Sequence, residues 1–120
     1  MLYKELSYEI MSAVFEVHNT LGPGFLEKVY ENALIAELLL RGIFAVAQQS
    51  LVVKYKGIEV GNYCADIVVN GQILLELKVV ESLSRAHEAQ ILNYLKATGL
   101  ELGILINFGK ERVESKRFVL

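Results

Sequence analysis

The feature that most constrains the fold is a strict alternation of apolar residues on both sides of an Asn70-Gly71 turn. The odd-numbered positions of this stretch are all apolar: Ala65, Ile67, Val69, Ile73, Leu75, Leu77 and Val79. Because side chains alternate between the faces of a strand, we expect these residues to share the core-facing side of a hairpin. A two-residue loop would bury Glu76 and Lys78 opposite Ile67. A three-residue loop with Gly71 in the left-handed conformation keeps every apolar side chain on one face, so the pattern predicts that loop.

The same register places Asp66, Glu76 and Lys78 together on the opposite face. The two carboxylates then lie on neighbouring strands, within roughly 5 to 8 Å at Cβ, and repel each other. A hard divalent cation such as Mg²⁺, or Mn²⁺ in its place, would relieve this repulsion by taking oxygen ligands from both. Lys78 could there orient or deprotonate an attacking water, or neutralise charge on a phosphate.

The alternative is that these three are ordinary polar residues of a solvated sheet face. Asp66 argues against it, because it is the only aspartate in the chain and interrupts an apolar strand, where aspartate is disfavoured.

The rest of the chain predicts an α/β fold in which one sheet is flanked by helices. Apolar residues at three- and four-residue spacing predict helices over 3–20 and 25–41, separated by Gly22-Pro23-Gly24, and a third over 84–98 that ends at Gly99. Residues 43–80 read as an antiparallel meander of three or four strands, broken at Lys56-Gly57, Gly61-Asn62 and Asn70-Gly71. A buried strand is expected over 102–107 and an edge strand over 113–119.

Size and composition predict one domain over residues 1–120, with 53% hydrophobic residues and a single proline. The lone Cys64 excludes an intrachain disulfide and a cysteine zinc cluster, and we expect it to be a small buried side chain. Charged residues near the N-terminus do not fit a signal peptide, and no run of about 18 apolar residues could span a bilayer. We therefore expect a cytoplasmic protein without a membrane partner.

Charge limits how the chain could meet nucleic acid. The formal net charge is −2, so contact with a polyanion must depend on a local basic patch or a bound cation. Lys110, Arg112, Lys116 and Arg117 form the one visible basic cluster, which Glu111 and Glu114 interrupt. The cluster is either a phosphate contact or an ordinary solvated terminal strand.

The segment GFLEKVY at 24–30 resembles the signature of the GxxExxY protein family, which is placed in the PD-(D/E)XK nuclease superfamily. The likeness continues along nearly the whole chain, at Phe15 to His18, Leu21 to Gly24, Tyr55 to Gly57, Ala65-Asp66, Glu76 to Lys78, His87, Ala89-Gln90, Asn93 to Gly99, Ile106 to Gly109 and Lys116-Arg117. It implies a central mixed sheet flanked by helices in the order αβββαβ, here with an extra N-terminal helix and C-terminal strand. It also implies Asp66 and Glu76 as metal ligands and Lys78 as the catalytic lysine, with Ala65 in place of the motif's proline.

The resemblance assigns Glu27 to an additional acidic residue that helps hold the metal. The alternative is structural: if Gly24 is the N-cap, Glu27 is the third helical residue, where an acid favours the helix dipole and can cap the backbone.

Gln90 and Tyr94 match a glutamine and a tyrosine that border the active site and the nucleic acid in RecB-like members. They are four residues apart and share one helix face with His87. The alternative for Tyr94 is core packing, and packing is also what we expect of Tyr30.

The first functional hypothesis is a Mg²⁺-dependent nuclease that hydrolyses phosphodiester bonds of nucleic acid, DNA rather than RNA. The second is a non-catalytic module that keeps the fold and binds nucleic acid or a protein. A third is a small interaction protein whose acidic pocket binds a metal for structural reasons. A homodimer could assemble a longer basic groove.

Overall fold

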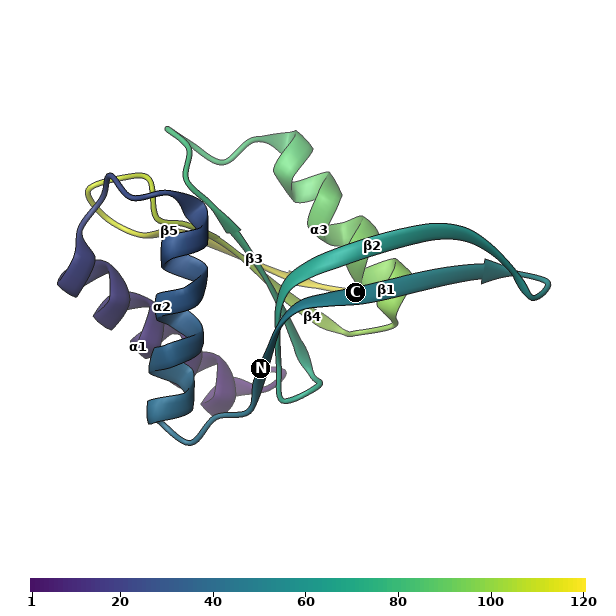
Figure 1. Cartoon of the computed structure of the whole chain (residues 1–120), viewed down its shortest axis with the longest axis horizontal. Helices are drawn as coiled ribbons and strands as arrows, with labels where there is room; N and C mark the ends of the chain where they lie inside the picture. Colours follow the sequence, from purple (N-terminus) through teal and green to yellow (C-terminus); the bar gives the residue numbers. More distant parts are fainter.

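The computed structural model describes residues 1–120 and contains three helices and five strands (Figure 1). In chain order they are α1 (Lys4–Leu21), α2 (Glu27–Leu40), β1 (Ala45–Tyr55), β2 (Ile58–Val69), β3 (Ile73–Lys78), α3 (Arg85–Thr98), β4 (Leu102–Asn107) and β5 (Glu114–Val119). The α/β fold class, with its extra N-terminal helix and C-terminal strand, is confirmed. No helix is both long and apolar enough to cross a bilayer.

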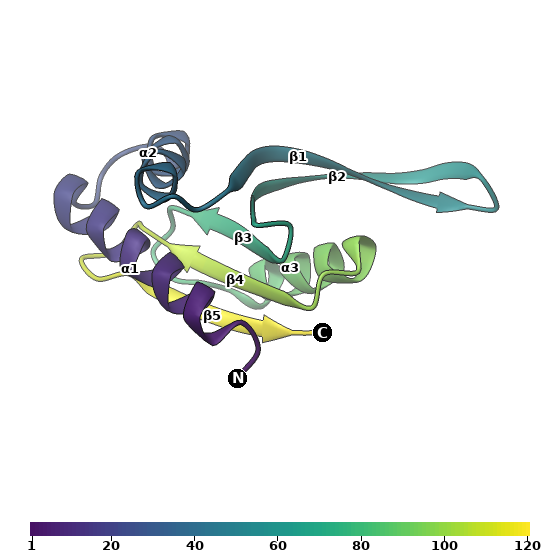
Figure 2. The same cartoon turned by 90° about the horizontal axis from the view of Figure 1, so that it is seen from below.

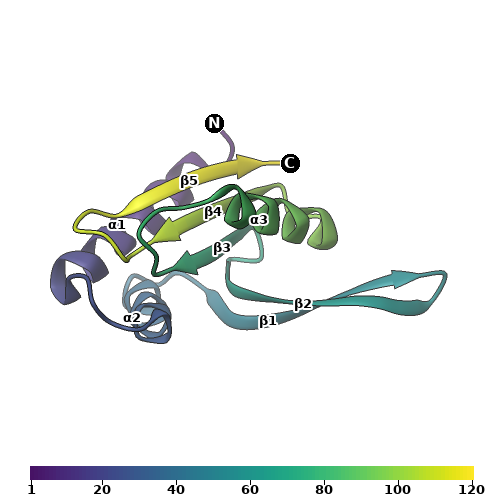
Figure 3. The same cartoon turned by 90° about the horizontal axis from the view of Figure 1, so that it is seen from above.

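The strands form one mixed sheet in the order β1-β2-β3-β4-β5, in which β3 and β4 are parallel and the other neighbours antiparallel. Helices α1 and α2 pack on one face and α3 on the other, so the sheet is the middle of three layers (Figures 2 and 3). Every residue of β4 is buried, as predicted for a strand covered on both faces, and β5 is an edge strand.

The β2–β3 hairpin has the predicted three-residue loop. Val69 pairs with Ile73 and Ile67 with Leu75, and Gly71 has a φ of 64°. The core beneath α1 and α2 contains the predicted odd-numbered residues Ile67, Val69, Ile73, Leu75 and Leu77, with Val79 packed against it. The prediction was wrong for Ala65, which packs on the α3 side, because strand β2 turns over between Ala65 and Ile67.

Beyond this point β1 and β2 leave the sheet as a two-stranded arm, residues 49–65 (Figure 1). Lys56 and Gly57 make its tight turn, both at positive φ. The chain has no strand break at Gly61-Asn62, and β2 is continuous through these residues. The irregularity is instead a register shift opposite them, between Val53 and Lys54 of β1. Three strands therefore precede α3, not four. Cys64 lies in this arm and is exposed, which corrects the expectation that it is buried.

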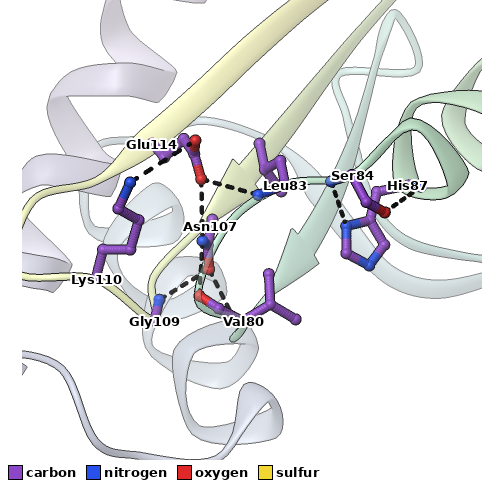
Figure 4. Close-up of polar contacts among 8 residues, drawn as sticks. All are labelled: Val80, Leu83, Ser84, His87, Asn107, Gly109, Lys110 and Glu114. Carbon is purple, nitrogen blue, oxygen red and sulfur yellow. Dashed lines mark hydrogen bonds and ion pairs between the residues drawn. The ribbon is translucent and has the colours of Figure 1, made fainter.

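The ends of β3 and β4 are joined by the fully buried side chain of Asn107, the Asn107 clamp (Figure 4). Its Oδ1 accepts hydrogen bonds from the backbone N–H groups of Val80 (3.0 Å) and Gly109 (2.9 Å). Its Nδ2 donates to the Val80 carbonyl (2.9 Å) and to Glu114 Oε1 (3.2 Å), which also accepts from Leu83 N–H (3.1 Å). The clamp therefore fixes the chain directly after Lys78.

Gly109 is required at the clamp by close approach. A Cβ added there would lie 2.6 Å from the backbone nitrogen and oxygen of Val80, closer than real Cβ contacts come. Only glycine lets the two backbone segments meet at this distance.

Candidate metal and catalytic site

Asp66 lies where strand β2 parts from β3 and where its pairing with β1 is interrupted for a single residue. The β1 register passes from Ala47↔Ile67 to Gln49↔Ala65, and the pairing with β3 ends at Ile67↔Leu75. Asp66 therefore has no paired residue in either neighbouring strand, and side-chain hydrogen bonds connect β2 to β3 at this point.

The carboxyls of Asp66 and Glu76 bridge the gap between β2 and β3. Asp66 N–H donates to Glu76 Oε1 (3.3 Å), and Leu77 N–H donates to Asp66 Oδ2 (2.8 Å). Each carboxyl thus accepts a backbone hydrogen bond from the opposite strand. This exchange holds the two acidic groups beside each other, as the sequence register predicted.

Burial makes this pair costly to ionise. Glu76 is 3% exposed, and burial, reinforced by the negative charge of Asp66, raises the pKa of its carboxyl to about 8. Burial also raises the pKa of Asp66, which the Leu77 hydrogen bond partly opposes. The pair therefore favours a shared proton, or a cation, over two free charges.

Lys78 connects the pair to helix α3. Its Nζ donates to Gln90 Oε1 (2.9 Å), and Gln90 Nε2 donates to Tyr94 Oη (3.2 Å). Burial, and next the charge of Glu76, raise the pKa of the Tyr94 phenol. Tyr94 also packs edge-on against Tyr63 of the arm, with ring centroids 5.2 Å apart. The structure thus brings Gln90 and Tyr94 to the lysine, and Tyr94 combines packing with a polar contact.

His87 shares the helix with these residues but has a local role. Its Nδ1 accepts from Ser84 N–H (3.1 Å) and its own N–H donates to Ser84 Oγ (3.3 Å), a capping box at the start of α3 (Figure 4). The side chain is therefore committed to helix capping.

Glu27 and Asp66 line one polar recess of about 220 Å³, together with Lys28, Glu31 and Gln48. Burial, and next the charge of Asp66, raise the pKa of Glu27, while the positive charge of Lys78 opposes the rise. Glu27 and Asp66 are therefore close enough to interact electrostatically. Gln90 and Tyr94, which the resemblance places at the border of the active site, do not line this recess.

The expected N-cap at Gly24 was wrong, because α2 begins at Glu27 with Leu26 as its N-cap and no side-chain cap. Tyr30 sets this start: its buried hydroxyl donates to the Gly22 carbonyl (2.5 Å) and accepts from Phe25 N–H (3.3 Å). Packing, as expected, is the role of Tyr30. Glu27 as the first helical residue still favours the helix dipole but does not fill the capping-box position.

Sequence reasoning missed Glu31 and Gln48. Glu31 is 3% exposed, and its carboxylate accepts from Lys28 Nζ (2.5 Å) and from Gln48 Nε2. Its spacing of four residues from Glu27, which places both on one helix face, was a signal that could have identified it. Gln48 carries no comparable signal.

Internal contacts occupy most of the predicted basic cluster. Lys116 pairs with Glu88 (2.9 Å) and Lys110 with Glu114 (3.9 Å), while Arg117 donates to Ser7 Oγ (2.8 Å). These contacts favour the alternative of an ordinary terminal strand over a phosphate-binding patch.

Comparisons with known proteins agree with this geometry. A family profile described as "PD-(D/E)XK nuclease superfamily" matches residues 4–118. The solved structures similar to this chain include one titled "Crystal structure of SSO0001", with a TM-score of 0.58 and 20% sequence identity over 78% of this chain. That match spans 50% of the other chain, and at this identity it supports the fold alone. Comparison with curated proteins gives no match.

Proposed function

The chain belongs to the PD-(D/E)XK nuclease superfamily, and from this membership we propose that it is a metal-dependent nuclease that hydrolyses phosphodiester bonds of DNA. One observation carries the proposal: the half-buried carboxyl of Asp66 and the buried carboxyl of Glu76 lie together where β2 and β3 part, and Glu76 shares β3 with Lys78. We propose that residues 1–120 work as one domain.

The side chains present fit a hard divalent cation. Asp66 and Glu76 supply oxygen atoms, which Mg²⁺ and Mn²⁺ accept, and their buried charges repel until a proton or a cation compensates them. When bound, the metal would supply Lewis acidity toward water and phosphate oxygen. No three His, Cys, Asp or Glu side chains are grouped to hold a metal, so most ligands of Mg²⁺ here would be water or substrate oxygens, as is usual for this ion.

Glu27 is proposed to add charge to this centre from helix α2. It lines the recess beside Asp66, and their charges interact. Because the three carboxyls are not grouped to hold one ion directly, its contribution would be a water-mediated contact with the cation.

Lys78 is proposed as the catalytic lysine. Held by Gln90, its ammonium would orient the attacking water or neutralise charge that grows on the phosphate. Gln90, which itself donates to Tyr94, would hold the Lys78 side chain toward α3. The Tyr94 hydroxyl would donate a hydrogen bond to the nucleic-acid backbone.

The test is incubation of the purified protein with single- and double-stranded DNA and RNA, in Mg²⁺, in Mn²⁺ and in chelator. We expect metal-dependent cleavage, faster on DNA. Asp66→Ala should abolish cleavage and weaken Mn²⁺ binding, and so should Glu76→Ala, because both carboxyls would bind the same ion.

The matched control is Glu101→Ala. Glu101 is an exposed acid whose side chain makes no hydrogen bond or ion pair, so both properties should stay unchanged. Absence of cleavage by the wild type in every metal would instead favour the non-catalytic binding module.

A further inference from the structure

Gln48 has an unusual backbone conformation for its position. Of the four non-glycine residues with positive φ, Tyr3 caps a helix and Lys56 and Asn70 lie in hairpin turns. Gln48, with φ of 53°, lies inside strand β1. A left-handed residue with a Cβ is strained, and such strain persists where the surrounding structure requires it.

The strained residue faces Asp66. The register passes from Ala47↔Ile67 to Gln49↔Ala65, so Gln48 and Asp66 are the two residues between consecutive pairs. Both also line the recess that contains Glu31. The break in the ladder therefore occurs at the level of the proposed metal ligand.

The side chain of Gln48 joins two elements across this break. Its Nε2 donates to Glu31 Oε1 on helix α2, and its Oε1 accepts from Cys64 Sγ on strand β2 (3.0 Å). Glu31 is itself held by Lys28. The residue with the left-handed backbone is thus the one whose amide connects helix α2 to strand β2 beside Asp66.

We propose that Gln48 is a positioning residue that fixes the carboxylate of Asp66 by tying helix α2 to strand β2 beside it. The inference rests on the proposed function in one respect: cation binding is the reason that the orientation of Asp66 matters. The amide suits the role because it can donate to a carboxylate and accept from a thiol at the same time.

The first test needs no metal and no substrate. Leu77 N–H donates to Asp66 Oδ2, so hydrogen exchange of the Leu77 amide in chelator reports how firmly Asp66 is held. Gln48→Gly removes the amide side chain yet suits a positive φ, so the melting temperature should hold or rise. We expect Leu77 to exchange about tenfold faster in this variant, because loss of one supporting hydrogen bond changes a local opening equilibrium by roughly this factor.

Two further variants separate the effect of the Gln48 side chain from the effect of its backbone conformation. Gln48→Glu keeps the length but sets a carboxylate against Glu31, and it should also speed exchange at Leu77. Gln49→Ala is the matched control, because Gln49 is the neighbouring exposed glutamine and its side chain makes no hydrogen bond. It should leave Leu77 unchanged.

The second test is titration with Mn²⁺ alone. Gln48→Gly should weaken Mn²⁺ binding about tenfold at unchanged stability, as loss of a supporting contact around a metal does. Unaltered Leu77 exchange in Gln48→Gly would overturn the positioning role. Faster exchange in a protein whose wild type binds no Mn²⁺ would keep the role of Gln48 and reject the proposed metal centre instead.

Discussion

The Asn107 clamp and the Asp66–Glu76 pair are neighbours in the sheet, since Lys78 pairs with Asn107. They differ in how far hydrogen bonds compensate the burial of their polar groups. In the clamp, every polar atom of Asn107 has backbone or carboxylate partners, and hydrogen bonds lower the pKa of Glu114. In the pair, burial raises the pKa of Glu76 to about 8. A buried polar group whose hydrogen bonds are all made stabilises the fold, whereas a buried carboxyl with a raised pKa is costly to ionise until a ligand compensates its charge.

The largest expected effect is loss of the clamp. Asn107→Ala should destabilise the protein by about 3 kcal/mol or more, because it removes all four hydrogen bonds of a fully buried side chain and leaves half-buried backbone groups of Val80 and Gly109 unpaired. Gly109→Ala should cost at least as much through its clash with Val80. Urea unfolding measures both, with Asn32→Ala on the exposed surface of α2 as the control. A loss below about 1 kcal/mol for Asn107→Ala would contradict a stabilising clamp.

Lys78 and Lys110 provide the next contrast, one beside the carboxyl pair and one beside the clamp. Lys78→Ala should reduce metal-dependent cleavage about 100-fold or more, the usual loss of an acid-base or electrostatic catalyst, while Mn²⁺ binding holds or tightens slightly. Lys110→Ala removes a long ion pair with Glu114 and should change cleavage less than about twofold. Full cleavage by Lys78→Ala would show that Lys78 is not the catalyst.

The pH dependence of stability should have opposite signs in the two regions. For Glu76 the pKa rises from 4.5 to about 8 on folding, so the folded protein keeps a proton that the unfolded chain has lost. This contribution is complete below about pH 4.5 and disappears as the pH rises toward 8. In chelator, wild-type stability should therefore fall over this interval, and Glu76→Gln should flatten the fall. Parallel curves for the two proteins in denaturant unfolding would refute the raised pKa.

The smallest expected effect concerns Glu114, whose pKa is lowered on folding because it accepts hydrogen bonds from Asn107 and Leu83. Its contribution is present above its ordinary pKa of 4.5 and is lost as the pH falls below it. Glu114→Gln should therefore cost about 1 kcal/mol or less near pH 7, since the group is partly exposed, and less still near pH 3. Denaturant unfolding near pH 7 and near pH 3 measures this loss of stability. An equal loss at each pH would contradict a lowered pKa for Glu114.

Much of the sheet could be predicted because its apolar pattern leaves one register. The alternation around Gly71 fixed the loop length and placed Asp66 beside Glu76. The pattern failed at Ala65, because the break opposite Gln48 has no local signature: glutamine carries no preference for positive φ.

Long-range contacts explain the other errors. Cys64 lies in an apolar run, but its exposure depends on whether a helix covers the arm, which periodicity does not encode. The start of α2 depends on a hydrogen bond from Tyr30 to Gly22, so the preference of Gly24 for a cap was overridden. The link between Glu31 and Gln48 likewise joins two separate elements.

The three-residue loop also has a kinetic consequence. Asp66 and Glu76 are only 10 residues apart in the chain, so they meet when the β2–β3 hairpin closes, an event that takes about 1–10 μs. Pairing of β3 with β4 must wait for the crossover through α3, whose loop closure is slower. The folding chain therefore brings these two carboxylates together early, and mild acid, which neutralises them, should speed hairpin closure.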